Sequence, residues 1–458
     1  MAQHLLAVLR LSVGLSHAGY AQLVADTHAA LGFGPLVARR EKVSRWESGR
    51  TVPSPTAQLA IAEIHGVPEA EVLRLGWPVW LSVAMRADSV SEGPWSPLGA
   101  VDAARALTGT SDDRSAFPLL LTSRGPALVA LLKGALAALE HPQPAPAQDG
   151  HAVSPESLDW IECRVRALER QEAGSPVTPS ALYHATRAEY RLVTGLLTGS
   201  GYDRRTAARL LYLVARTTRL LACLSTCLGD FATAERYSLA SLRAATAVGA
   251  RRQSVVSLAD LAGLHAVVGA PRDALSVLSA ARSTSPRLAP RLAALVDSWE
   301  ALALARTGEK SSSVRVLDRA GQTLSNSQRQ PAVADGLPVQ DLDDMRLRLC
   351  TGLSLLYQDQ HAEALKWLVP LTDAQAAVGP DGPTPSPFTA GILLYAVDAQ
   401  LALGDLDSAV HSTRYASALA GGLPRALDRE YRRRFAPHRG EPLVQELLGL
   451  LSGPRSGT

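Results

Sequence analysis

The stretch Arg39-Arg-Glu-Lys-Val-Ser-Arg-Trp-Glu-Ser-Gly-Arg50 decides how the first 80 residues of this chain fold. Val43 and Trp46 lie three residues apart, a spacing that places both side chains on one face of a helix, toward a core. The stretch holds five basic and two acidic residues, a local charge of +3. Gly49 marks the end of the helix. The sequence therefore predicts a basic helix over about residues 36–48, anchored by one apolar face, with Arg39, Arg40, Lys42 and Ser44 projecting outward.

Outward from this stretch, residues 1–80 predict a small bundle of five short helices. Ser16 and Ser54 are suited to cap helix starts, and glycines follow the expected helix ends. Pro35 suits a first helical position, which favours a helix that begins at Leu36. The five predicted helices span about residues 2–13, 17–30, 36–48, 55–65 and 68–75.

Composition limits where such a chain can bind nucleic acid. The 458 residues are 47 % hydrophobic and 19 % charged, which supports a sizeable core and excludes wholesale disorder. The net charge is only +3, and residues 1–80 carry seven basic against six acidic residues. Positive charge is therefore focused on the helix near residues 36–48. A helix of this kind can enter the DNA major groove, although such charges can also form a solvated face.

Helical periodicity runs through nearly the whole chain, which predicts an all-α fold. The first zone, residues 1–80, is compact. Residues 81–155 read as a partly irregular connector, with a proline-rich run at residues 141–150. Residues 156–452 read as long helices separated by glycine or proline.

The sequence also predicts a cytoplasmic protein with no membrane segment. No apolar stretch reaches the roughly 18 residues that a membrane helix needs, and charged residues interrupt the most apolar ones. The apolar residues 5–13 contain Arg10 and follow no basic segment, which argues against a signal peptide. The four cysteines lack metal-ligand spacing and are expected to be buried thiols of a reduced protein.

Three motifs of the first zone resemble the Xre-type, Cro-repressor-like helix-turn-helix signature: Leu15-Ser16, Val43–Arg50 and Pro53-Ser54. The resemblance covers about 70 residues. It implies that the basic helix is a recognition helix whose residues before the Ser-Arg-Trp-Glu run touch bases. His17 stands where the family commonly has a glutamine that contacts DNA, and it lies farther from Trp46 than in compact members. The implied base readers are Arg39, Arg40, Glu41, Lys42 and Ser44, and the implied phosphate contacts are Arg45 and Arg50. His17 stands at a position that contacts either phosphate or base.

The second half of the chain shows internal similarity at five predicted helix turns. In four of them a glycine is followed five residues later by a small residue, and in the fifth Asp359 takes the place of the glycine. A glycine lets the first helix end and the chain turn, and a small residue lets the second helix pack closely. This pattern resembles tetratricopeptide repeats over roughly residues 204–421, although its spacing exceeds that family's 34 residues. The five pairs are Gly229/Ala234, Gly269/Ala274, Gly308/Ser313, Asp359/Ala364 and Gly404/Ala409.

The helical array offers one candidate effector site. Four arginines and a tyrosine at steps of four and three residues form one stripe on a predicted helix, and the first helices of repeat pairs line a concave face. Such a row can bind a carboxylate, an acidic peptide or a phosphate. The alternatives are a solvated stripe or pairing with nearby acidic side chains. The row consists of Arg205, Arg209, Tyr212, Arg216 and Arg219.

The whole arrangement resembles actinomycete transcriptional regulators that have an Xre-type head and a tetratricopeptide-like body. We expect a homodimer that binds double-stranded DNA, because one small head makes few phosphate contacts. The helix predicted at about residues 441–452 would cap the array or pair with another subunit. No catalytic residues, metal ligands or cofactor motif emerge, so an enzyme is not expected. The main alternative is a repeat scaffold whose head binds protein, and a weaker one is direct regulation of an enzyme or sigma factor.

Overall fold

The computed structural model describes residues 4–13, 15–65, 67, 69–81, 90, 93–108, 121–174, 179–285, 287–328, 342–371, 389–419, 422–423 and 425–451. Within these ranges every regular element is a helix, and β-type pairing is limited to two isolated bridges. The bridges join Gln148 to Tyr202 and Ala152 to Gly201. The prediction of an all-α fold is confirmed for this part of the chain.

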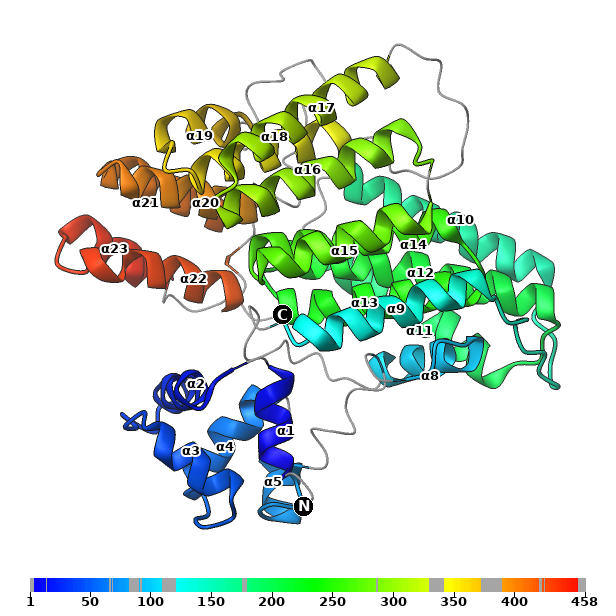
Figure 1. The fold of residues 1–458 in the computed structure, drawn as a ribbon, viewed down its shortest axis with the longest axis horizontal. Helices are drawn as coiled ribbons and strands as arrows, with labels where there is room; N and C mark the ends of the chain where they lie inside the picture. Colours follow the sequence, from blue (N-terminus) through cyan, green and yellow to red (C-terminus); the bar gives the residue numbers. More distant parts are fainter. Residues whose placement is uncertain are drawn as a thin grey trace.

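The head, residues 4–81, has five short helices and a hydrophobic core of its own (Figure 1). Both predicted caps are present, since Ser16 Oγ accepts a hydrogen bond from the Gly19 amide at 3.2 Å and Ser54 Oγ one from Ala57 at 3.3 Å. The helices are α1 (Leu5–Ser12), α2 (His17–Ala30), α3 (Arg40–Glu47), α4 (Pro55–Ile64) and α5 (Glu69–Leu75).

Helix α3 begins at Arg40, four residues later than the sequence predicted. Leu36 packs against the core of the head, and Arg39 is extended, with φ −122° and ψ 125°. Pro35 therefore precedes an extended segment and does not start a helix. The chain needs these extended residues to reach α3 from the end of α2 while Leu36 stays in the core.

The long connection between α2 and α3 is fastened to the rest of the head. Gly32 and Gly34 adopt φ of +81° and +86°, a region that favours glycine, and so turn the chain sharply. The buried His28 ring then bridges two elements: Nδ1 lies 2.9 Å from the Gly34 carbonyl oxygen and Nε2 lies 3.0 Å from Thr56 Oγ1 on α4. The extra length relative to a compact helix-turn-helix is thus held against α4.

The body, residues 90–451, is built from successive helical hairpins (Figure 1). Pairs α12/α13, α14/α15, α16/α17, α18/α19 and α20/α21 pack in order along the chain. The helices are α10 (Pro155–Gly174), α11 (Pro179–Gly199), α12 (Arg204–Cys227), α13 (Phe231–Ala247), α14 (Arg251–Val267), α15 (Pro271–Thr284), α16 (Pro290–Thr307), α17 (Lys310–Gln328), α18 (Leu342–Leu356), α19 (His361–Leu368), α20 (Thr389–Ala402) and α21 (Leu406–Leu419).

All five helix turns predicted from the internal similarity lie between the two helices of a hairpin. Gly229, Gly308 and Gly404 have positive φ, and Asp359 adopts φ 62° where the glycine is missing. The small residues that follow these turns are fully buried, as close packing of the second helix requires. They are Ala234, Ala274, Ser313, Ala364 and Ala409.

Two helices of the predicted connector share the core of the body. Helices α8 (Pro97–Thr108) and α9 (Gly125–Glu140) pack on α11, α13 and α15. Arg243 of α13 is buried and donates hydrogen bonds to the carbonyls of Val90, Gly93 and Pro94, at 2.5, 2.7 and 3.1 Å. Apolar burial thus draws part of the segment expected to be irregular onto the body, and the body begins at Val90.

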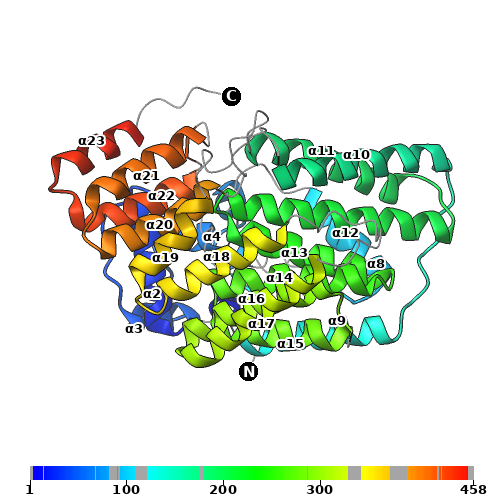
Figure 2. The ribbon, with the colours of Figure 1, turned by 90° about the horizontal axis from the view of Figure 1, so that it is seen from above.

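The two ends of the body differ in how they finish the array. Figure 2 shows α10 and α11 at one end, and α21 with α22 (Arg425–Phe435) and α23 (Pro442–Leu451) at the other. Helix α22 was not predicted from the sequence. Helix α23 was predicted, and it packs against α21 and α22 through the buried residues Val444 and Leu447, so it covers the last hairpin.

The structure differs from the sequence predictions at one cysteine and in the length of one apolar helix. Cys223, Cys227 and Cys350 are buried thiols as expected, but Cys163 of α10 is exposed. Helix α12 is long and apolar enough to cross a membrane by length and composition alone. Because 89 % of its most apolar window is buried inside the protein, α12 matches the core helix of a globular body.

Candidate nucleic-acid interface

Helix α3 is anchored by two side chains and leaves its other face open. Val43 is fully buried and Trp46 is 7 % exposed, and both belong to the core of the head. Arg39, Arg40, Glu41, Ser44, Arg45 and Arg50 are exposed, and Lys42 is half-buried. The predicted reading face is therefore present on α3 and its two ends, free of covering protein in this structure.

Charge on the open face is partly paired within the face itself. Arg40 Nε donates to Glu41 Oε1 at 3.0 Å. A hydrogen bond from the backbone of Glu41 itself, followed by the Arg40 side chain, holds the pKa of Glu41 below its usual value. Glu41 therefore stays ionised near neutral pH and can accept a hydrogen bond, for example from a cytosine amino group.

A clasp of three side chains fixes the end of α3. The Arg10 guanidinium of α1 donates through Nε to Glu47 Oε1 at 2.5 Å and through Nη2 to Oε2 at 3.2 Å. His17 Nε2 lies 3.0 Å from Glu47 Oε2, and Arg10 Nη1 also donates to the Leu15 carbonyl at 2.7 Å. The clasp, defined as Arg10, Glu47 and His17, thus ties α3 to α1 and to the start of α2.

Sequence reasoning placed only one member of this clasp. His17 was assigned to DNA contact by resemblance, and its side chain keeps 42 % exposure beside its bond to Glu47. Arg10 and Glu47 were not singled out. The available signal was a lone arginine on the otherwise apolar α1, because a charged residue on a buried face needs a partner.

A half-buried histidine should make the head sensitive to acid. His65 Nε2 lies 2.8 Å from the hydroxyl oxygen of Tyr20, and burial lowers the pKa of His65 to about 4. The unfolded chain, in which histidine titrates near 6.5, therefore binds more protons than the head does below that pH. The head should lose stability as pH falls from 6.5 toward 4, by at most about 3 kcal/mol.

We expect this loss of stability to appear as faster hydrogen exchange in α2 and α4 at pH 5 than at pH 7. The measurement uses the full-length chain and is corrected for intrinsic exchange rates. His65→Gln keeps a polar partner for Tyr20 and cannot titrate, so its pH dependence should be weaker. An equal dependence in both proteins would rule out His65 as the cause.

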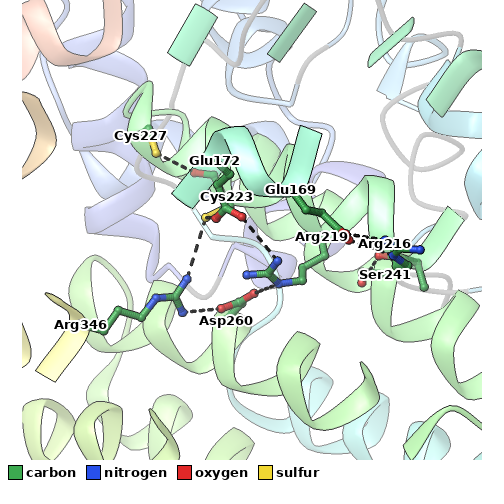
Figure 3. A network of polar contacts seen from close by, with 10 residues as sticks. Glu169, Glu172, Arg216, Arg219, Cys223, Cys227, Ser241, Asp260 and Arg346 are labelled. Carbon is green, nitrogen blue, oxygen red and sulfur yellow. Dashed lines mark hydrogen bonds and ion pairs between the residues drawn. The ribbon is translucent and has the colours of Figure 1, made fainter. Parts of the chain in front are cut away.

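The predicted arginine row on α12 has carboxylate partners at three positions, and Figure 3 shows those of Arg216 and Arg219. Arg209 contacts Asp159 and Glu162 of α10 at 2.6 and 2.8 Å. Arg216 pairs with Glu169 at 2.5 Å, and both are buried. Arg219 is 3.7 Å from Glu172 and 3.2 Å from Asp260 of α14. The row is therefore not an open cationic surface here.

The other two members of the row differ from these three. Arg205 is exposed near the start of α12, and Tyr212 is half-buried. Burial raises the pKa of Tyr212, so its hydroxyl stays neutral and can donate a hydrogen bond. Pairing with nearby acidic side chains, one of the alternatives that the sequence left open, thus describes the centre of the row.

No metal centre is formed by the residues that the structure describes, where no three His, Cys, Asp or Glu side chains gather in a suitable group.

Comparisons with known proteins locate one family within the chain. No curated protein and no solved structure matches it. Residues 4–75, which span α1 to α5, match the family model described as a helix-turn-helix domain. The head is thus a helix-turn-helix domain, and this domain points to a DNA-binding regulator.

Proposed function

We propose that the protein is a sequence-specific transcriptional regulator of the Xre type. The observation that carries the proposal is the geometry of α3, whose core face is filled by Val43 and Trp46 while its basic face stays open. Arginine and lysine on such a face can read guanine edges in the major groove and pair with phosphates. No catalytic role is assigned to any residue.

Within this proposal the residues of the open face divide into two roles. Side chains near the start of α3 would reach base edges, whereas those at its end and at the start of α2 would contact the DNA backbone. The proposed base readers are Arg39, Arg40, Glu41, Lys42 and Ser44, and the proposed backbone contacts are Arg45, Arg50 and His17.

The body would bias the head through a bound peptide, small effector or protein partner. Its ordered hairpins favour a tetratricopeptide-like array, and such arrays bind ligands on the face of their first helices. An anionic ligand on the row formed by Arg205, Arg209, Tyr212, Arg216 and Arg219 would have to displace carboxylates of α10 and α14 at three positions. We also propose that two chains pair, so that two heads engage two half-sites.

DNA binding is tested by a duplex shift assay on the full-length chain over a series of salt concentrations. Wild type should bind fragments selected from its own genome with an affinity that falls steeply as salt rises. Replacing Arg39 and Arg40 by alanine should weaken binding to the selected fragments at least about tenfold and reduce discrimination against unrelated duplexes, because each base-reading side chain contributes about 1–3 kcal/mol of specificity.

The matched control replaces Arg287 and Arg315, two exposed arginines of the body, by alanine. This variant loses the same charge and should keep its affinity and discrimination. Binding by the Arg39 and Arg40 variant at wild-type strength would contradict the proposed interface. Absence of binding by wild type to any genomic fragment would favour a repeat scaffold whose head binds protein.

A further inference from the structure

A buried ion network joins the first helices of several hairpins on one face of the body (Figure 3). Three ion pairs join a glutamate of α10 to an arginine of α12, and in each pair the two residues are 47 positions apart in the sequence. The pairs are 162–209, 169–216 and 172–219. This constant offset means that the two helices run parallel with their charges in register. We define the buried ion network as Glu169, Glu172, Arg216, Arg219, Asp260 and Arg346.

One member of the network comes from a distant hairpin. Arg346 of α18 donates through Nη1 to Asp260 Oδ1 of α14 at 2.8 Å, and its Nη2 lies 4.0 Å from Cys223 Sγ of α12. Helix α16 precedes α18 in the array, yet the Arg346 side chain reaches α14 and α12. Arg346 therefore joins the later hairpins to the earlier ones across the face of the first helices.

A second contact shows that the body curls back on itself. A Cβ added to Gly229, in the turn between α12 and α13, would lie 3.0 Å from the side chain of Leu427 on α22. The last helices of the chain thus meet the turn that follows α12. Residues that are about 200 positions apart in the sequence are therefore in contact at this turn.

The charges of this network balance only when every member is present. Three carboxylates face three guanidiniums, and the side chains of Arg219 and Arg346 are each 9 % exposed. Asp260 accepts from both of these arginines, so it holds two positive charges together. Loss of Asp260 or of Arg346 alone leaves one uncompensated charge in the interior, which is far costlier there than in water.

A largely buried charged pair such as Asp260 and Arg346 suits a contact that can open reversibly. An opened array would let Asp260 and Arg346 hydrate separately, so their desolvation on closure offsets much of their attraction. An apolar contact at the same place would gain nothing from hydration on opening, so the whole free energy of its burial would oppose opening. A buried charged pair is therefore suited to an element with two arrangements of similar free energy.

The network also lies next to the helix that holds the start of the body. Helix α12, which carries Arg219, packs along α13, and Arg243 of α13 binds the carbonyl of Val90. Nine residues earlier, Leu81 is fully buried in the core of the head. A change in the arrangement of α12 and α13 would thus act where the link to the head begins.

We propose that Asp260 and Arg346 form a latch that holds the body closed, and that opening this latch changes the DNA affinity of the head. This inference rests on the proposed DNA-binding function and extends it to regulation. A ligand acts on the latch by binding the open and closed arrangements with different affinity. The carboxylates and guanidiniums that become free on opening favour a charged ligand.

The test uses the full-length chain and three variants: Asp260→Asn, Arg346→Met, and both changes together. Hydrogen exchange reports opening, and a shift assay with the fragment that wild type binds best reports the head. Each single variant should exchange at least tenfold faster than wild type in residues 346–356. Each should also change the DNA affinity at least threefold, and the two single variants should change it in the same direction. The double variant balances the charges again but lacks the latch, so its exchange and its DNA affinity should lie between those of wild type and those of the single variants.

The control is Arg319→Met, which removes the exposed Arg319 of α17 from the buried Asp297 of α16 and leaves Arg282 as the partner of Asp297. It should change neither DNA affinity nor exchange in α18. If Arg346→Met fails to fold, Arg346→Lys takes its place in the test. Lysine keeps the positive charge but has a shorter side chain, so it reaches Asp260 less well.

The possible outcomes distinguish failure of the latch from failure of the proposed DNA-binding function. If wild type binds DNA and the single variants bind with wild-type affinity despite faster exchange, the network is only structural and the latch is overturned. If a folded single variant leaves exchange in α18 unchanged, the latch does not hold the body closed. If wild type binds no fragment, the DNA-binding proposal fails, and the regulatory inference fails with it.

Discussion

Replacing Glu47 by alanine should unfold the head and abolish its binding to DNA. Glu47 is the shared acceptor of the clasp, and its side chain is only 10 % exposed. Its removal leaves the Arg10 guanidinium buried, with a hydrogen bond to the Leu15 carbonyl but without its carboxylate partner. Removing one member of a buried ion pair typically costs 3–5 kcal/mol, about the whole stability of a small domain.

Hydrogen exchange in α1 to α4 of the full-length variant measures this loss, with the body as an internal reference. Glu41→Ala is the matched control, because it removes the same charge from the exposed face of α3 and should leave exchange in the head nearly unchanged. The double variant Arg10→Met with Glu47→Leu removes both buried charges and should recover most of the stability. Slow exchange throughout the head of the Glu47→Ala protein would show that the clasp is dispensable.

Replacing Arg243 by methionine should release the segment at residues 90–96 from the body. The guanidinium donates to three backbone carbonyls and stacks 4.2 Å from the ring centroid of Trp95. Methionine fills similar volume and donates nothing, so the buried Val90 carbonyl loses its donor at about 1–3 kcal/mol, and the more exposed carbonyls of Gly93 and Pro94 lose theirs at a smaller cost. We expect a loss of about 2–4 kcal/mol in the local stability of this segment and of α8.

The measurement is hydrogen exchange in residues 93–108, compared with that in α16 of the same protein. Arg243→Lys should recover only part of the protection, because one ammonium cannot reproduce the planar fork or its stacking on Trp95. Arg272→Met, an exposed arginine on α15, should have no effect. Equal protection of residues 93–108 in wild type and in Arg243→Met would contradict the assigned role of Arg243.

Local patterns predicted the hairpins of the body well. A glycine that ends a helix and a small residue five positions later act within one turn, so the sequence alone reveals them, as at Gly229 and Ala234. The same holds for the start of α2, where the Ser16 side chain bonds an amide three residues ahead. The start of α3 was missed because the burial of Leu36, a tertiary effect, overrides the local helix signal.

The charged contacts could not be predicted from local patterns, because their partners are far apart in the sequence. Spacing on α12 identified the arginine row, but only the fold shows that Glu169 and Glu172 of α10 face it. Likewise, Arg10 and Glu47 are 37 residues apart, and Asp260 and Arg346 are 86 apart. The proposed DNA contacts on α3 stay predictions, although the exposed face that they require is present.

The short interval between Leu81 and Val90 limits how far the head can lie from the body. Both residues are fully buried, one in the core of the head and the other in the core of the body. Nine residue steps of extended chain span at most roughly 30 Å. In a pair of chains joined through their bodies, a head that leaves DNA therefore stays within a small volume around its partner. Its return then depends on the length of this connection, and not on the number of molecules in the cell.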